Sequence, residues 1–464
     1  MLISEEPAHE TYRAIILGRN GTEVLLRRLD AGLHFPHVTI AGWQRVAESV
    51  TAAVKKQWGA EILCLFELDS PLDGQDSSPY VVAIYWRTSE RSAVTLHWIS
   101  ANDLGENSFA EPVDYSALQR SLNQSSAADR APGVGPFARL SWFRELCEWI
   151  GAVIAPRGLH LNGNFRQLNA SPTFSLIRFE TNGPAAWFKA VGDPNEREFP
   201  ITLTVARLFP QYAPEILSTF PEWYGWLMGE AEGTNLDETT DPLLWQAAAA
   251  ALANLQIESI PTYGELADCG AHDLKVSTLR SLVSPFMDVA AGLMKRQSKT
   301  PPPVLSEIEL RILEERLHAA LCALEGLGIP GALGHLDLNP ANLIVSGKRC
   351  VFLDWAEAYV GNPFLSFQYL LEHFRRTGAD STSEKQLVAS YLGPWEQIVS
   401  RERVAEAAEL APLLATFAYA VGNGTWSQPE HVDQPKVAGY MRSLVRRMSS
   451  EAHKLSERRS PCLS

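Results

Sequence analysis

The sequence predicts an α+β fold in which a strand-rich N-terminal part precedes a helical C-terminal part. Short runs of β-branched and aromatic residues, separated by turn residues, recur through much of the first 230 positions. Beyond residue 233 the apolar residues recur mainly at helical spacing. With 464 residues, of which 46% are hydrophobic, the chain is long enough for two or three domains with apolar cores.

Composition excludes some classes of partner. A net charge of -14 argues against nonspecific nucleic-acid binding, which needs a basic surface. Six cysteines are scattered without a C-x-x-C pair, which is typical of reduced thiols in the cytosol. The first ten residues lack the pattern of a signal peptide, and no apolar run reaches membrane length. We therefore expect a cytoplasmic protein with no membrane or nucleic-acid partner.

Residues 1–112 are predicted to form a small α/β domain. A helix over Val46–Trp58 ends at Gly59 and is surrounded by strands. The expected strands are Tyr12–Leu17, Glu23–Leu26, Ile62–Leu68, Tyr80–Arg87 and Val94–Ile99. Two histidines, His34 and His37, have no cysteine or carboxylate at ligand spacing, so we do not expect them to bind a metal.

The order of these elements resembles the Nudix hydrolase fold. The signature helix of that fold carries glutamates that bind metal, and here Gly42 and Glu48 match only its start. Lys55 and Lys56 stand where further acidic residues would follow. The resemblance therefore implies a Nudix-like domain without a hydrolase site.

A linker is expected over residues 113–140. This stretch is rich in Ser, Ala, Pro and Gly and shows no apolar period. From Ser141 a helix is expected, because Trp142, Leu146, Trp149, Ile150 and Val153 recur at helical spacing.

Two strands follow, over Phe174–Glu180 and Ala185–Val191. Lys189 lies within the second strand between apolar neighbours, where an ammonium group is costly unless it meets an anion. The alternative is a lysine on an edge strand that keeps its head in water.

Most of the remaining chain is predicted to be helical. Ser306 and Glu309 form a capping box at the start of one helix. The other expected helices are Leu243–Leu255, Pro363–Phe374, Lys385–Tyr391, Val404–Ala420 and Gln434–Lys454.

A β-hairpin interrupts these helices and gathers polar residues at one end. Its strands are the apolar runs Leu343–Val345 and Cys350–Leu353, which a Gly-containing turn separates. Asn342 precedes the first strand, Asp354 follows the second, and Asp337 lies five residues before Asn342. An amide and a carboxylate suit Mg²⁺, and a second carboxylate suits a general base. The alternative is an ordinary hairpin with polar ends.

The pattern His335-x-Asp337-x-x-x-x-Asn342, followed by Asp354, resembles the catalytic segment of the aminoglycoside phosphotransferase family. This family is the small-molecule branch of the protein-kinase-like fold. The resemblance implies a bilobal fold, with a β-rich N-lobe over 141–230 and a helical C-lobe over 231–464. It also implies Asp337 as catalytic base, Asn342 and Asp354 as Mg²⁺ ligands, and ATP as the phosphate donor.

The same resemblance assigns the nucleotide contacts. It implies that Lys189 holds the phosphates and that a helix glutamate holds Lys189. Glu198 is the candidate and Glu196 the alternative, because Pro200 must fall in the first turn of that helix. The stretch Trp226–Gly233 resembles the hinge between the lobes. There Met228 would pack beside the adenine ring, which would bond to the Gly229 carbonyl and the Ala231 N–H.

The spacing after Asp354 limits the substrate. Only nine residues lead from Asp354 to Pro363, where the next expected helix begins, which leaves no room for a platform that docks a peptide. We expect a small hydroxylated substrate, such as an amino sugar, sugar or amino alcohol, bound between Asp337 and the C-terminal helices. Glu357 could attract an ammonium group there, or it could be a solvated residue or an extra metal ligand.

One departure from the family pattern keeps a second reading open. Asn362 and Ser366 stand where the family usually has carboxylates that brace the catalytic loop. The alternative function is therefore a nucleotide-binding regulatory module with a Nudix-like sensor domain.

Overall fold

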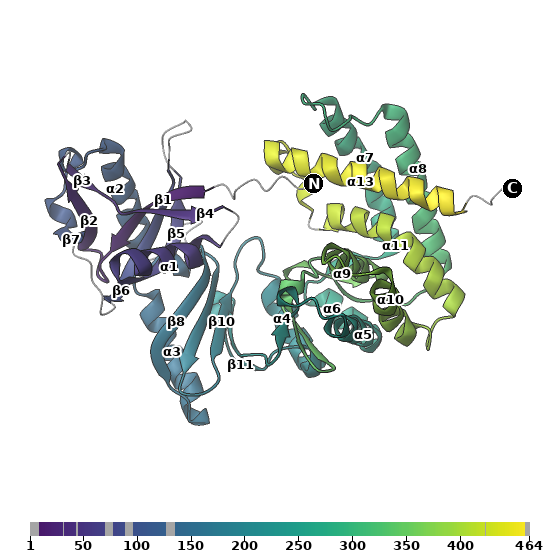
Figure 1. The fold of residues 1–464 in the computed structure, drawn as a ribbon, viewed down its shortest axis with the longest axis horizontal. Coiled ribbons are helices and arrows are strands. Elements are labelled where there is room, and N and C mark those ends of the chain that lie inside the picture. The colour runs from purple at the N-terminus through teal and green to yellow at the C-terminus, as the bar shows by residue number, and fades with distance from the viewer. Residues whose placement is uncertain are drawn as a thin grey trace. The chain divides into compact units, whose positions relative to one another are not determined.

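The computed structural model describes residues 9–30, 32–42, 45–69, 78–88, 96–126, 135–422 and 424–459. The chain divides into two compact units, and each is described by itself. Unit 1 comprises Met1–Phe199 and Ile216–Glu230, and unit 2 comprises Pro200–Glu215 and Ala231–Ser464. The sheets concentrate in unit 1 and the helices in unit 2, which confirms the predicted α+β class (Figure 1).

A seven-stranded mixed sheet forms the N-terminal part of unit 1. Its central order is β3-β2-β1-β6-β5, with β4 paired to β1 and β7 paired to β2. Strands β1 and β6 run parallel, whereas the other pairs are antiparallel. The strands are β1 (His9–Leu17), β2 (Glu23–Leu29), β3 (Gly32–His34), β4 (His37–Ala41), β5 (Ala60–Leu68), β6 (Tyr80–Thr88) and β7 (Leu96–Ser100).

Helix α1 (Val46–Trp58) has the predicted bounds. Its apolar face buries Ala47, Val50, Val54 and Trp58, and Gly59 ends it in the left-handed conformation that glycine adopts most readily. The five expected strands all correspond to observed ones, although Val94 lies outside the described residues.

The predicted linker over 113–140 is wrong for its first half. Residues Pro112–Ser126 form helix α2, which packs on the first sheet. Its Asp114 is 1% exposed and accepts hydrogen bonds from Arg13 Nη1 at 2.7 Å and from the Tyr80 hydroxyl at 2.7 Å. A polar helix can fold here because its buried carboxylate meets a buried guanidinium. Residues 127–134 of the expected linker lie outside the described residues.

A second, antiparallel sheet completes unit 1, in the order β11-β12-β10-β9-β8. The strands are β8 (Leu161–Ala170), β9 (Ser175–Thr181), β10 (Ala186–Ala190), β11 (Ile216–Phe220) and β12 (Gly225–Gly229). Helix α3 (Trp142–Ile154) buries Trp142, Leu146 and Ile150, as its spacing predicts. This sheet matches the expected strand-rich segment that begins at residue 141.

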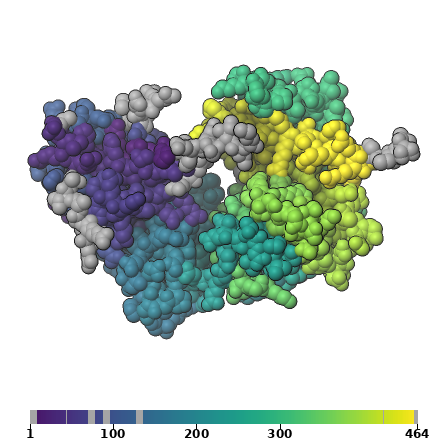
Figure 2. All heavy atoms as spheres, in the orientation of Figure 1, coloured from purple at the N-terminus to yellow at the C-terminus, as the bar shows by residue number. Residues whose placement is uncertain are grey.

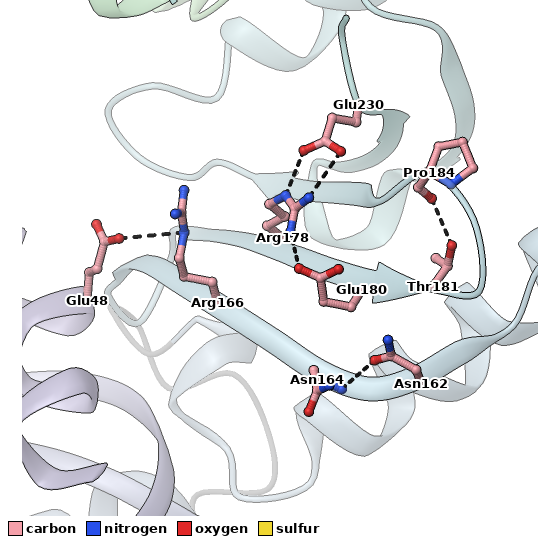
Figure 3. Close-up of polar contacts among 9 residues, drawn as sticks. All are labelled: Glu48, Asn162, Asn164, Arg166, Arg178, Glu180, Thr181, Pro184 and Glu230. Atoms are coloured by element: carbon pink, nitrogen blue, oxygen red, sulfur yellow. Dashed lines mark hydrogen bonds and ion pairs between the residues drawn. The ribbon is translucent and has the colours of Figure 1, made fainter. Parts of the chain in front are cut away.

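The two sheets of unit 1 share one core. A single apolar cluster contains Ile15 and Leu63 from the first sheet, Ile150 from α3, and Ile177 and Phe188 from the second sheet. At the seam where β5 of the first sheet meets β8 of the second, the Gln167 side chain accepts from the Cys64 N–H and donates to the Cys64 carbonyl, both at 2.8 Å. An ion pair between Arg166 and Glu48 crosses the same seam at 3.6 Å (Figure 3).

Unit 2 is mostly helical. Helix α13 lies against α7, α8 and α11, which Figures 1 and 2 show as a yellow element beside green ones. Ser306 and Glu309 form the predicted capping box at the start of α8. Helix α4 (Glu198–Leu208) begins in unit 1 and continues into unit 2. The other helices are α5 (Pro242–Ser259), α6 (Tyr263–Asp268), α7 (Val276–Lys295), α8 (Glu307–Gly326), α9 (Phe364–Arg376), α10 (Ser381–Trp395), α11 (Arg401–Gly422), α12 (Pro429–Val432) and α13 (Pro435–Arg459).

Within the described residues, one helix is long and apolar enough by composition to span a membrane. It is α11, and 61% of its most apolar window is buried inside the structure. Burial of that kind is typical of a helix in a folded core.

Two small sheets carry the polar loops of unit 2. The predicted hairpin forms from β16 (Leu343–Ser346) and β17 (Arg349–Phe352), and β13 (Thr234–Asn235) pairs with β16. The other sheet has the order β14-β18-β15, from β14 (His272–Leu274), β15 (Ala332–His335) and β18 (Ala358–Gly361).

Candidate active site

The loop that carries Asp337 starts at the end of β15 and is held by neutral groups. His335 is 1% exposed, and its backbone N–H donates to the Ser366 hydroxyl at 2.8 Å. Its ring Nε2 donates to the Leu353 carbonyl at 3.1 Å, which ties the loop to the hairpin. Burial lowers the pKa of His335, so the ring is neutral near pH 7. This geometry agrees with the structural role that its position suggests.

Asn342 is joined to the Asp337 loop by its amide. Its Nδ2 donates to the Asp337 backbone carbonyl at 3.2 Å. That bond orients the amide so that the acceptor atom Oδ1 remains for a cation. The backbone N–H of Asn342 donates to the Asn339 carbonyl at 2.8 Å, which fixes the short turn between the two residues.

Asp354 lies at the same end of the hairpin as Asn342. The register pairs Leu343 with Phe352, and the Leu353 N–H donates to the Asn342 carbonyl at 2.9 Å. Asn342 therefore faces Leu353, whereas the expected strands Leu343–Val345 and Cys350–Leu353 would have placed it opposite Asp354. Asp354 is exposed and has φ of 63° and ψ of 65°. This left-handed conformation is uncommon outside glycine and recurs at functional sites.

The oxygen donors at this hairpin end fit a magnesium ion better than a transition metal. An amide oxygen and a carboxylate are hard ligands, and Mg²⁺ takes its remaining ligands from phosphate and water. In the part of the chain that the structure describes, no group of three or more His, Cys, Asp and Glu residues could hold a metal. A site with two protein ligands would depend on a bound nucleotide to complete the shell.

The two uncharged replacements, Asn362 and Ser366, make specific hydrogen bonds. Ser366 accepts from the His335 N–H and lies 3.0 Å from the Tyr359 hydroxyl. Tyr359 donates to the Asn362 carbonyl at 2.8 Å, and Asn362 Oδ1 accepts from the Phe364 N–H at 3.1 Å. The positions that usually carry bracing carboxylates therefore still hold the loop, without charge.

In unit 1, Lys189 and Glu198 form a buried ion pair. Lys189 Nζ lies 2.5 Å from Glu198 Oε1, and the two residues are 5% and 1% exposed. Glu198 is the first residue of α4, with Pro200 in the first turn, as expected. Glu196 is exposed, so the alternative partner is wrong.

The stretch assigned as a hinge lies where the chain leaves unit 1. Met228 and Gly229 end β12, and Ala231 is the first residue of the second part of unit 2. Met228 packs with Val191 and Trp226 in a small apolar cluster. Arg178 makes a two-pronged ion pair with Glu230, at 2.7 Å and 3.1 Å, which anchors the end of β12 (Figure 3).

A cavity of about 190 Å³ opens beside Asp337 within unit 2. Tyr369 from α9 lines it and donates its hydroxyl to Asp337 Oδ1 at 3.4 Å. Burial, and next the Asp337 carboxylate, raise the pKa of Tyr369 to about 12, so the phenol stays protonated. The other lining residues are Leu336, Leu365, Gln368, Glu372, His373, Arg376, Ala415, Thr416, Tyr419, Tyr440, Leu444 and Arg447.

The cavity lies between Asp337 and the C-terminal helices, the region expected for the substrate, but the sequence did not predict its lining residues. No local pattern in α9 or α13 marks Tyr369 or Arg376 as functional. Glu357, for which a place beside the substrate was one of three alternatives, does not line the cavity and lies 3.9 Å from His272.

Comparison with known proteins supports the family resemblance over part of the chain. Residues 201–405 match the model of the phosphotransferase enzyme family. This segment contains Asp337, Asn342 and Asp354, which confirms the family to which the motif pointed, whereas Lys189 and Glu198 lie just before it. No curated protein matches the chain.

Solved structures of several kinases are similar to the chain at low identity. A macrolide 2′-phosphotransferase from Brachybacterium faecium is 15% identical, with a TM-score of 0.44, over 65% of this chain and 98% of that one. An ethanolamine kinase from Plasmodium vivax is 14% identical, with a TM-score of 0.46, over 72% and 94%. A choline kinase from Cryptosporidium parvum is 14% identical, with a TM-score of 0.46, over 67% and 96%. Because these TM-scores are below 0.5, we draw no conclusion from them.

Proposed function

We propose that this chain, whose residues 201–405 match the phosphotransferase enzyme family, is an ATP- and Mg²⁺-dependent kinase of a small hydroxylated molecule. The observation that carries the proposal is the arrangement of Asp337, Asn342 and Asp354 at one end of the hairpin. Asn342 is bonded to the Asp337 loop, Asp354 ends the hairpin, and the cavity beside Asp337 can receive an acceptor.

Each residue has a separate role in the proposed reaction. The Asp337 carboxylate accepts the proton of the acceptor hydroxyl as its oxygen attacks the γ-phosphorus. Asn342 Oδ1 and the Asp354 carboxylate would hold Mg²⁺, which neutralises charge on the phosphates when bound. Lys189, held by Glu198, would bind the nucleotide phosphates. The Gly229 carbonyl and the Ala231 N–H would bond to the adenine ring, with Met228 beside it.

The N-terminal domain has a supporting role in this proposal. We assign it a Nudix-like fold without hydrolase activity, because its helix α1 is occupied by ion pairs. Glu48 pairs with Arg166, and Lys55 pairs with Glu61 at 2.7 Å. A cytoplasmic location fits the unpaired state of the cysteines in the described residues, Cys64, Cys147, Cys269, Cys322 and Cys350.

The decisive experiment separates chemistry from nucleotide binding. We expect Asp337→Asn to lower phosphate transfer from ATP by about 10²–10⁴-fold, since that is what a positioned general base contributes. The dissociation constant for Mg²⁺–ATP should stay within about threefold, because Asp337 is not assigned to the metal. ADP release with a panel of sugars, amino sugars, amino alcohols and sugar acids measures the first quantity, and calorimetric titration measures the second.

Asp288→Asn is the matched control, since Asp288 is exposed on α7. Undiminished turnover in Asp337→Asn would contradict the proposal. ATP binding without Asp337-dependent transfer to any acceptor would instead favour the regulatory module that Asn362 and Ser366 leave open.

A further inference from the structure

The cavity beside Asp337 carries charges that restrict its ligand. Among the described residues that line it, Glu372 is the sole carboxylate. Glu372 forms an ion pair with Arg447 and accepts from Gln368 Nε2 at 3.0 Å. Its charge is therefore already compensated inside the protein, and it has little left to attract an ammonium group.

Arg376 adds a positive charge that this pair does not balance. It lies at the end of α9, is exposed, and lines the cavity. Its neighbour Arg375 forms an ion pair with Glu384 at 2.6 Å. The charge of Arg375 is therefore already compensated by the protein, which makes Arg376 the better candidate to bind an anionic ligand. Burial, and next the charge of Arg376, lower the pKa of His373, which keeps that lining residue neutral at pH 7.

Aromatic rings form another part of the cavity wall. Tyr369 and Tyr419 stack with centroids 5.8 Å apart and planes at 24°, and Tyr440 meets Tyr419 edge-on at 6.4 Å. Such faces suit the flat or apolar side of a ring. They could also hold a cation, but the Arg376 charge on the same cavity opposes a further positive charge.

We infer that the acceptor is a ring-bearing hydroxyl compound with a negatively charged group, and that Arg376 selects it. This inference rests on the proposed function and specifies its substrate. The acceptor's hydroxyl oxygen bonds to the γ-phosphorus while the bond to the β–γ bridging oxygen breaks. ADP leaves, and the hydroxyl proton passes to Asp337. The ring packs on the tyrosine faces, and the anionic group meets Arg376.

Matched acceptors test the charge preference with the full chain. Glucuronate, glucose and glucosamine share one frame and differ in charge, as do 4-(hydroxymethyl)benzoate, benzyl alcohol and 4-(hydroxymethyl)benzylamine. In at least one frame we expect the acid to exceed both other members in kcat/KM by at least tenfold. A neutral or amino member that matches or exceeds the acid in both frames would overturn the inference.

Substitutions at Arg376 test the assigned residue. Arg376→Gln should raise KM for the acid about tenfold or more with little change in kcat, because a contact to a remote group binds ground state and transition state alike. Arg376→Lys should keep part of the preference, and Arg376→Glu should shift it towards the amine. Arg375→Gln is the control, since that arginine is already paired. An equal effect of both Gln substitutions would overturn the assignment.

Titration of the same compounds keeps this inference separate from catalysis. Binding of the acids that weakens in Arg376→Gln would support the inference even if no phosphate were transferred, and the proposed kinase activity alone would then fail. If the acids bind no more tightly than the amines, the inference fails whatever the turnover.

Discussion

Lys189 and Glu198 bring two opposite charges into a part of unit 1 that water hardly reaches. Their side chains are 6% and 2% exposed, and Lys189 Nζ also lies 5.8 Å from the ring centroids of Phe174 and Trp226. An apolar pair of similar size could be as stable, since the removal of two ions from water offsets most of their attraction. The retention of charge here therefore agrees with a role in binding phosphates rather than in stability.

Removal of one charge of this ion pair should lower the stability of the fold more than removal of both charges. We expect Glu198→Gln to lower the free energy of unfolding by about 3–5 kcal/mol, because it removes the carboxylate that lies 2.5 Å from the buried Lys189 ammonium. Addition of Lys189→Met to that variant should restore part of the loss. Urea unfolding of Glu198→Gln, Lys189→Met, the double variant and the exposed control Glu196→Gln measures the coupling energy between the two residues. Equal stability of Glu198→Gln and Glu196→Gln would show that the pair is not formed.

The sequence was enough to find these catalytic candidates but not the acceptor side of the site. Lys189 could be predicted because an apolar strand isolates it. Glu198 was a candidate from the family resemblance, and Pro200 left Glu196 open as the alternative. Arg376 and Tyr369 could not, because their meeting depends on how α9, α11 and α13 pack. The hairpin itself could be predicted, but its second strand is Arg349–Phe352 rather than the expected Cys350–Leu353, so Asn342 faces Leu353 instead of Asp354.

At the scale of elements, helix α2 shows what composition conceals. Its sequence is polar, so hydrophobic periodicity gives little signal, yet Ala117 and Leu118 are fully buried. Its position depends on Arg13, about a hundred residues earlier, which contacts both Asp114 and Glu111. Local sequence patterns do not contain such a long-range charge contact, whereas α1, with its regular apolar face and final Gly59, was predicted to the residue.

Glu61 on β5 contacts Lys55 on α1 and Arg87 on β6, and the stabilisation from these contacts should depend on pH. Burial alone would raise the pKa of Glu61, but its hydrogen bonds to Lys55 and Arg87 outweigh that effect and hold the pKa below its ordinary value. The contacts of Glu61 with the two cations therefore stabilise the fold at a pH above the unfolded pKa of about 4.3. This stabilisation is lost as the pH falls through the lower pKa that Glu61 has in the folded protein.

Glu61→Gln should lower the free energy of unfolding by up to about 1 kcal/mol at pH 7, because both cations are near the surface. The difference from the parent protein should vanish in acid. Urea titrations from pH 7 to pH 3 measure it, with the exposed Glu23→Gln as control. A difference that stays constant over this range would rule out an ionic origin.

At the scale of the whole chain, the seven-stranded N-terminal sheet and the second sheet are two parts of one unit. Sequence reasoning separated them at a linker, whereas the structure places their apolar residues in a single cluster. Gln167 satisfies both backbone groups of Cys64 and so acts like one more residue of the neighbouring strand. We therefore expect the first and second sheets of unit 1 to unfold together rather than as separate domains.

Gln167→Ala tests this cooperativity. It should lower the free energy of unfolding of unit 1 by about 1–3 kcal/mol for each Cys64 group left without a partner. Amide exchange should then rise in step on both sides of the seam, at Ile15 in the first sheet and at Ile177 in the second, because one core supports both. Asn162→Ala, at an exposed position of the same strand, should change neither, because its side chain accepts from the Asn164 N–H of that strand at 2.9 Å. Faster exchange at Ile15 with unchanged exchange at Ile177 would mean that the two sheets are independent domains, and that the N-terminal domain could be removed without loss of the proposed kinase.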